Sequence, residues 1–247
     1  MLEEDSVIVL RTIKHAESSL VVQCYSSKHG RTAVYAAGMG KRGSRGGLQT
    51  FHPLAILNLS LYSKANGTMA SIKEVSPAFD LSPLRNNMLK GCMAMFMSEL
   101  FLKTVVEEEP NQLLYTFLQT TTQMLAAKEG SLANFPLMFL IHLSSIIGFK
   151  PQSNYSHNQA DVFALNTGSF ENPEQRTIGI SYLSPVETDL LKKLLNTDFQ
   201  RMDEVKSNGA TRNSLIRGML SYLSIHLGHD IELKSLQVLH EIFASTA

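Results

Sequence analysis

The first 75 residues alternate between short runs rich in Val, Ile and Leu and clusters of turn-forming residues. This pattern is typical of β-strands joined by tight connections. Turn signals lie at KHGR (28–31) and at Asn66-Gly67, and Asn-Gly is the strongest short hairpin signal in a sequence. Because no helix separates the runs, a parallel sheet is disfavoured, and a small antiparallel barrel of the OB type fits best. The expected strands are residues 6–13, 18–26, 32–38, 54–63 and 68–75.

Beyond Pro83 the apolar positions take on helical spacing. Asn134 is expected to cap a helix that ends at Gly148, and this helix is apolar on nearly every side, which places it in the core. Ser184 and Glu187 form the sequence of a capping box around Pro185. Residues 152–183 have an irregular pattern, with short strands expected at 162–166 and 177–183. The expected helices are residues 84–106, 112–128, 134–148, 184–195, 212–228 and 234–243.

These elements predict an α+β chain of more than one domain. We expect an OB-fold β-barrel at residues 1–80, followed by an α-helical domain at residues 81–247 that carries the irregular insert at about 152–183. Of the 247 residues, 44% are hydrophobic and 18% are charged, which is a globular composition. The most apolar stretch, residues 135–149, is shorter than the roughly 20 residues that a membrane span needs. The acidic start MLEEDS does not resemble a secretion signal, so we expect a cytoplasmic protein.

The net charge is zero, but the charges are distributed unevenly along the chain. Residues 1–80 carry nine Lys and Arg against six Asp and Glu, whereas the remainder carries 13 basic and 16 acidic residues. Between Glu17 and Glu74 there are seven basic residues and no acid. Such an asymmetry suggests that the N-terminal part meets a polyanion. Cys24 and Cys92 are too few for a disulfide framework or a cysteine zinc site, so we expect both to be reduced and structural.

The stretch GMGKRGSRGGLQ (38–49) contains Gly38, Gly40 and Gly43 in the spacing G-x-G-x-x-G. A dinucleotide-binding turn would need a helix directly after it and an acid about 20 residues later. The residues that follow, SRGGLQTFHPL, will not form a helix, and the next acid is Glu74. We therefore expect no nucleotide cofactor here. Two interpretations remain: a solvated loop whose charges only keep it in solution, or a loop that binds the phosphates of a polymer through its glycines and cations.

Aromatic side chains occur around this loop in the expected barrel. Bases of a single strand can stack on such rings, although each ring alone is more typical of a barrel core than of a stacking platform. Their combination with an acid-free basic stretch favours nucleic-acid binding. The aromatic residues concerned are Tyr25, Tyr35, Phe51, His52 and Tyr62.

Several segments together resemble the RecO family of bacterial DNA repair and recombination proteins. The resemblance begins in residues 8–31 and continues through AAGMGKRGSRGGLQTFHPL (36–54), where the family has a glycine- and base-rich loop followed by L-Q-x-F. It returns in IIGFKP (146–151), SPVETDLLKKLL (184–195) and HLGHDIELKSLQVL (226–239). The resemblance spans essentially the whole chain, and the order and spacing of the segments carry it.

The resemblance implies an N-terminal OB domain and a C-terminal helical domain. It also implies a non-catalytic mediator in RecF-pathway repair after DNA damage. Such a protein binds single- and double-stranded DNA, anneals complementary strands, and works with RecR and the C-terminal tail of single-strand-binding protein so that RecA can load. Many family members carry a cysteine zinc site after the G-F-x-P segment. Here residues 152–170 contain no cysteine and His157 is alone, so we expect a zinc-free insert and no cofactor.

We expect no enzyme, because no nucleophile and base occur in a convincing pair. His226 and His229 are three residues apart, but solvated helix-end histidines explain them better than a metal site. The alternative function is a protein-interaction scaffold whose barrel binds peptides. The expected DNA contacts are Lys28, Arg31, Lys41, Arg42, Arg45 and Lys64, with Tyr35 as a stacking ring and Arg11 and Lys14 as lesser candidates.

Overall fold

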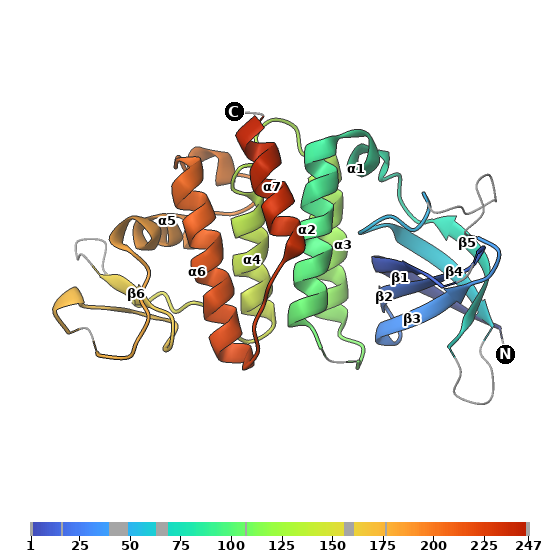
Figure 1. Ribbon diagram of the computed structural model, residues 1–247, viewed down its shortest axis with the longest axis horizontal. Helices are drawn as coiled ribbons and strands as arrows, with labels where there is room; N and C mark the ends of the chain where they lie inside the picture. The colour runs from blue at the N-terminus through green and yellow to red at the C-terminus, as the bar shows by residue number, and fades with distance from the viewer. Residues whose placement is uncertain are drawn as a thin grey trace. The chain divides into compact units, whose positions relative to one another are not determined.

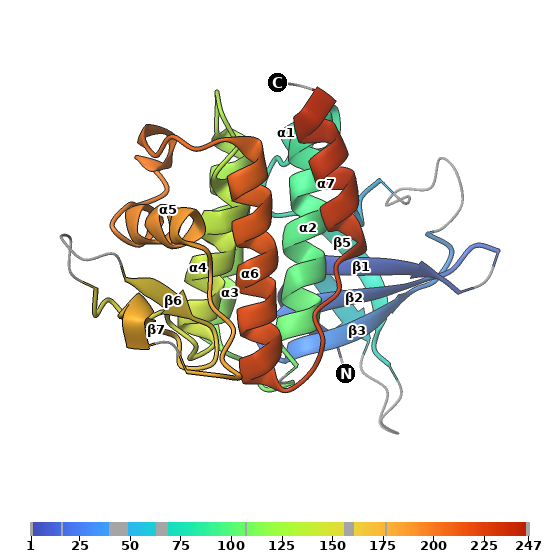
Figure 2. The same ribbon diagram turned by 60° about the vertical axis from the view of Figure 1, so that its left-hand side comes forward.

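The computed structural model describes residues 2–15, 17–39, 49–62, 69–106, 108–155, 161–175 and 177–245. The chain forms two compact units, Met1–Lys128 and Glu129–Ala247 (Figures 1 and 2). The first unit contains the sheet and three helices, and the second contains the remaining helices and a small two-stranded sheet.

Five strands of the first unit close into a barrel. They are β1 (Leu2–Lys14), β2 (Leu20–Ser26), β3 (Gly30–Ala36), β4 (Ile56–Tyr62) and β5 (Ser71–Pro77), in the order β1-β2-β3-β5-β4. The β3–β5 pair is parallel, and the other pairs are antiparallel. This is the closed Greek-key barrel of an OB-fold, so the expected fold class is confirmed.

The alternating apolar residues that predicted the strands also provide the side chains of the barrel core. On β2 and β4, every second residue points inward and is fully buried, while the residues between them face outward. A register shift in β1 between Val9 and Arg11 inserts an extra residue and bends the strand. The barrel core contains Val7, Val9, Leu20, Val22, Cys24, Val34, Ala36, Phe51, Leu57, Leu59, Leu61 and Ile72.

β1 begins four residues earlier than the expected strand, at Leu2. Acidic residues have low strand propensity, so the EEDS segment gives no local signal. Pairing with β4, from Leu2 opposite Tyr62 to Ile8 opposite Ile56, supplies the missing stabilisation. The acidic start of the chain is therefore part of the barrel.

Three helices complete the first unit: α1 (Ser82–Asn86), α2 (Met88–Thr104) and α3 (Gln112–Ala127). The single helix expected at residues 84–106 is wrong, because Asn87 interrupts it. Asn87 is extended and caps α2, with its side chain accepting a hydrogen bond from the Lys90 backbone. α2 packs on β1, and Phe101 of α2 lies edge-on against Tyr25 with ring centroids 5.1 Å apart.

The second unit is built around α4 (Phe135–Ile146), whose residues 135–141 are all buried, as its uniform apolarity predicted. The expected capping box at Ser184 and Glu187 is confirmed at the start of α5. Asn134 precedes α4, but its side chain does not cap the helix; its amide donates to the carbonyls of Met202 and Val205 instead. The other helices are η1 (Pro173–Gln175), α5 (Pro185–Leu195), η2 (Met202–Glu204), α6 (Gly209–Leu227) and α7 (Lys234–Ser245).

The insert contains a short hairpin of β6 (Val162–Ala164) and β7 (Ser169–Glu171). The first strand was expected. The prediction of the second strand at residues 177–183 is wrong, because β7 lies at residues 169–171. Gly168 adopts a positive φ of 66° and turns the chain directly back onto β6. Residues 177–183 contribute one isolated bridge, between Tyr182 and Ala164. Among the described residues, no helix is long and apolar enough to cross a membrane.

Candidate nucleic-acid interface

The barrel presents an outward face on β1, β2 and β3. Cross-strand register places Arg11 opposite Gln23, and Gln23 opposite Ala33. A second row on the same face runs from Ile13 through Val21 to Tyr35. These positions alternate with core residues such as Val22 and Val34, so their side chains point away from the barrel interior.

The second row continues around the barrel. Tyr35 pairs with Ser71 of β5, and Ser71 pairs with Tyr62 of β4. The two tyrosines are therefore separated by two strand spacings, about 10 Å. We call this surface the tyrosine face. It comprises Arg11, Ile13, Val21, Gln23, Ala33, Tyr35, Ser71 and Tyr62.

Both tyrosine rings have a polar or cationic neighbour. The ring of His15 lies edge-on to Tyr35 with centroids 5.8 Å apart. Tyr62 is 49% exposed, and the ammonium of Lys73 lies 5.9 Å from its ring centroid. Tyr35 is half-buried, so Tyr62 is the more accessible of the two rings. An accessible ring beside a cation can stack a base and attract the adjoining phosphate. Lys14, at the end of β1, is exposed and paired in register with Leu20.

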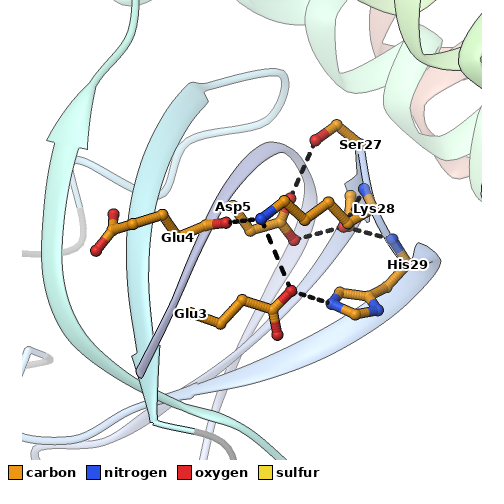
Figure 3. Close-up of polar contacts among 7 residues, drawn as sticks. Glu3, Glu4, Asp5, Ser27, Lys28 and His29 are labelled. Atoms are coloured by element: carbon orange, nitrogen blue, oxygen red, sulfur yellow. Dashed lines mark hydrogen bonds and ion pairs between the residues drawn. The ribbon is translucent and has the colours of Figure 1, made fainter. Parts of the chain in front are cut away.

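Lys28 and Arg31 belong to a different part of the barrel. Arg31 is four residues from Tyr35 on β3, about 13 Å along the strand. Its Nη1 donates to the Val105 carbonyl at 3.1 Å. The Lys28 ammonium donates to the Glu4 carbonyl and lies 3.9 Å from a Glu3 carboxylate oxygen (Figure 3). Each cation thus already contacts an acceptor of the protein.

The turn between β2 and β3 is held by a polar network (Figure 3). The buried Asp5 carboxylate accepts the Ser26 hydroxyl at 2.5 Å and the Ser27 hydroxyl at 3.1 Å. Ser26 Oγ in turn accepts the backbone N–H groups of Lys28 and His29 at 3.0 and 2.8 Å. This network orders the turn and concentrates negative charge beside it, which disfavours a phosphate at Lys28.

The remaining expected contacts divide into two groups. Tyr25 and Phe51 are buried at 0% and 2% exposure, so the stacking role considered for them is wrong and they are core residues. Segments 40–48 and 63–68 contain the other expected cations, and these segments lie outside the described residues. The cations concerned are Lys41, Arg42, Arg45 and Lys64.

Tyr62 and Lys73 were not among the DNA contacts that the sequence predicted. In LNLSLY (57–62) the leucines at every second position are buried, which leaves Tyr62 on the outer surface. That alternation was visible in the sequence and could have separated Tyr62 from the core rings. Lys73 gave no local signal, because its proximity to Tyr62 depends on the pairing of β4 with β5.

The described part of the insert does not fit a zinc site. Within the described residues, no group of three or more His, Cys, Asp and Glu side chains could hold a metal ion. The ammonium of Lys192 on α5 contacts the insert instead: its Nζ lies 3.5 Å from Asp161 and within 5.5 Å of the ring centroids of Tyr155 and Phe170. His226 is also structural, with its Nε2 2.9 Å from the Leu165 carbonyl and its ring against Tyr222.

A closed OB barrel with aromatic rings that face outward, joined to a helical segment, has the architecture of an oligonucleotide-binding protein. Sequence comparisons then define the family. The model described as Recombination protein O N terminal matches residues 1–79, and the model described as Recombination protein O C terminal matches residues 85–237. The chain belongs to the RecO family, whose members act in DNA repair and recombination.

Curated relatives agree over nearly the full length of the chain. The chain is 30% identical to a DNA repair protein RecO of Flavobacterium psychrophilum, over 96% of this chain and 97% of the relative. It is also 30% identical to that of Christiangramia forsetii, over 98% of this chain and the whole relative. Identity to the Bacteroides fragilis protein is 27% over similar coverage.

Proposed function

We propose that this chain is a non-catalytic mediator of recombinational repair that binds single-stranded DNA across the tyrosine face. The observation that carries the proposal is the outward placement of Tyr35 and Tyr62 in one row of an OB barrel. Bases stack on the two rings, and Arg11 and Lys73 lie close enough in the fold to neutralise the adjoining phosphates.

Most of the electrostatic attraction in this proposal comes from the basic segment that follows Met39. Lys41, Arg42 and Arg45 are joined to the end of β3, which carries Tyr35, and Lys64 follows Tyr62 by two residues. Each phosphate that these cations neutralise releases counterions, so affinity falls steeply with salt concentration. The glycines among them allow close approach of the backbone to phosphate.

Annealing follows from the same arrangement. A protein that screens the phosphates of two strands while leaving base edges accessible raises the rate at which complementary strands pair. From the family resemblance we further propose binding to double-stranded DNA. The proposed protein partners are RecR and the C-terminal tail of single-strand-binding protein, and the outcome is RecA loading. We also propose a cytoplasmic location, because the proposed substrate is chromosomal DNA. We retain residues 1–80 as the DNA-binding domain and residues 81–247 as the helical domain.

Substitution of the two rings tests the proposal. Tyr35→Ala and Tyr62→Ala should each lose a stacking contact worth about 1–3 kcal/mol, which is roughly a 5- to 150-fold loss of affinity for a single-stranded oligonucleotide. Tyr35→Phe and Tyr62→Phe keep the ring and should bind like the parent. Fluorescence anisotropy at fixed salt measures all four. Alanine variants that retain parental affinity would remove the tyrosine face from DNA binding.

The salt dependence of binding separates this function from a peptide-binding scaffold. The parent should show a steep linear fall of log affinity with log salt. A scaffold whose barrel binds peptides would show no such salt dependence in an oligonucleotide-binding assay.

A further inference from the structure

A cavity of about 390 Å³ lies where the start of β4, the end of β5 and α1 meet. Its floor is apolar: Ile56, Leu57 and Leu81 line it, and each is at least 95% buried. The ring of Phe79 also lines the cavity and is 40% exposed. An apolar floor with an accessible ring beside it suits a planar, partly apolar ligand.

Polar groups of both kinds line the same cavity. Arg85 and Gln49 supply hydrogen-bond donors, and Asp80 supplies a carboxylate. His52 Nδ1 is 3.0 Å from the Pro53 carbonyl, so in the neutral ring this nitrogen is the donor and Nε2 remains an acceptor. Burial lowers the pKa of His52, and the nearby Arg85 lowers it further, against the opposing effect of the Pro53 hydrogen bond. The neutral form therefore predominates at neutral pH.

We infer that this cavity accepts one nucleotide of a bound single strand, with the base on Phe79 and the phosphate at Arg85. The inference rests on the proposed DNA-binding function and adds a site outside the tyrosine face. A nucleobase offers a planar ring for Phe79 and an edge of donors and acceptors for Gln49, His52 and Asp80. Arg85 provides the planar fork of donors that matches a phosphate.

Two features favour a nucleotide over an acidic peptide. Asp80 lies at the cavity beside Arg85, and the pKa of its carboxyl is lowered by hydrogen bonds from Ser82 with a smaller contribution from Arg85. The ionised carboxylate accepts hydrogen bonds from the amino groups of a base, which the side chains of an acidic peptide do not offer. Gln49 lines the cavity and follows Arg45 by only four residues in the sequence, so the cations that the proposed function assigns to phosphates adjoin the cavity lining along the chain.

The test compares two oligonucleotides of equal length, one with natural bases and one with an entirely abasic backbone. Phe79→Leu removes the planar ring but keeps an apolar side chain. It should weaken binding of the natural strand about tenfold and leave binding of the abasic strand unchanged. Phe79→Tyr keeps the ring and should bind both strands like the parent. Thermal unfolding of each variant confirms that the fold is retained.

Arg85→Gln tests the phosphate contact. The substitution should weaken binding of both the natural and the abasic strand, and by more than Lys103→Gln weakens it. Lys103 is a matched control because it lies in the last turn of α2, roughly 20 Å of helix from its start. Equal losses from the two substitutions would mean that Arg85 contributes only general charge and would overturn the phosphate assignment.

Three outcomes would overturn the base assignment. One is a Phe79→Leu loss that is equal for natural and abasic strands, and another is no loss for either strand. The third is an acidic peptide that competes with DNA for the parent but not for Phe79→Leu, which would assign the cavity to a peptide. In each case a parent protein that still binds oligonucleotide with a steep salt slope leaves the proposed function standing. A parent that binds no oligonucleotide overturns both.

Discussion

Gly30, at the β2–β3 turn, packs closely against the backbone of the segment between α2 and α3. Its replacement by alanine should destabilise the first unit strongly. Gly30 has a φ of 63°, which costs an L-residue about 1–2 kcal/mol. An added Cβ would also lie 2.5 Å from the Glu109 carbonyl oxygen and close to the Glu108 carbonyl oxygen. Both contacts are with backbone, which cannot rotate away, so overpacking adds about 1–3 kcal/mol. Together the two effects should lower the free energy of unfolding of the first unit by about 2–5 kcal/mol.

Gly38 provides the matched control for this prediction. Its φ is 70°, but a Cβ added there would meet nothing within 4 Å. Gly38→Ala should therefore lose only the conformational part, about 1–2 kcal/mol. The difference between the stability losses of the two variants therefore measures the contact of the turn with residues 108 and 109.

Hydrogen exchange measured by mass spectrometry is the suitable assay, because the two compact units need not unfold together. Peptides covering β2 and β3 should exchange faster in Gly30→Ala than in Gly38→Ala, while α4–α6 peptides remain like the parent in both. If the two variants show equal exchange in β2 and β3, the barrel turn is not anchored on the helical segment and the packing described above is wrong.

Two further predictions concern other sites. Lys192→Met leaves the Asp161 carboxylate, whose side chain is only 9% exposed, without its ammonium partner; the insert should lose on the order of 2–4 kcal/mol, less than for a fully buried pair, and Lys192→Arg should lose much less, as urea titration will show. A β6–β7 hairpin that exchanges no faster in Lys192→Met would contradict this role. Burial, aided by the Asp5 charge, raises the pKa of the Cys24 thiol to about 12, whereas an unfolded thiol ionises at about 8.5. The stabilising contribution is therefore complete below pH 8.5 and is lost as pH rises toward 12; the free energy of unfolding should fall with pH less in Cys24→Ala than in the parent, and equal slopes would refute the assignment.

Local sequence patterns predicted the elements whose signals are local. Alternating Leu57, Leu59 and Leu61 predicted a strand with one buried face, and Ser184 with Glu187 predicted the start of α5. The break at Asn87 was also encoded locally, because asparagine favours an N-cap over a helix interior. The apolar run that follows it, MLKGCMAMFMSELFL (88–102), concealed that signal.

Tertiary pairing decided the features that the sequence could not supply. Glu3 and Glu4 have no strand signal, yet β1 includes them because β4 pairs with them. The Glu3 carboxylate and the Glu4 backbone carbonyl both contact the Lys28 ammonium. The number of basic residues along the chain therefore overstates the positive charge that this part of the barrel offers a phosphate. Tyr35 and Tyr62 are 27 positions apart, and only the strand order β3-β5-β4 brings them into one row.

The central claim is that nucleic acid binds through positive charge beside the tyrosine face. The most direct measurement is the affinity for a single-stranded oligonucleotide as a function of salt, for the parent and for a variant with Lys41, Arg42 and Arg45 all changed to Glu. We predict a more than tenfold loss of affinity at low salt and a shallower salt slope in the variant. A variant that binds like the parent at every salt concentration would contradict the account.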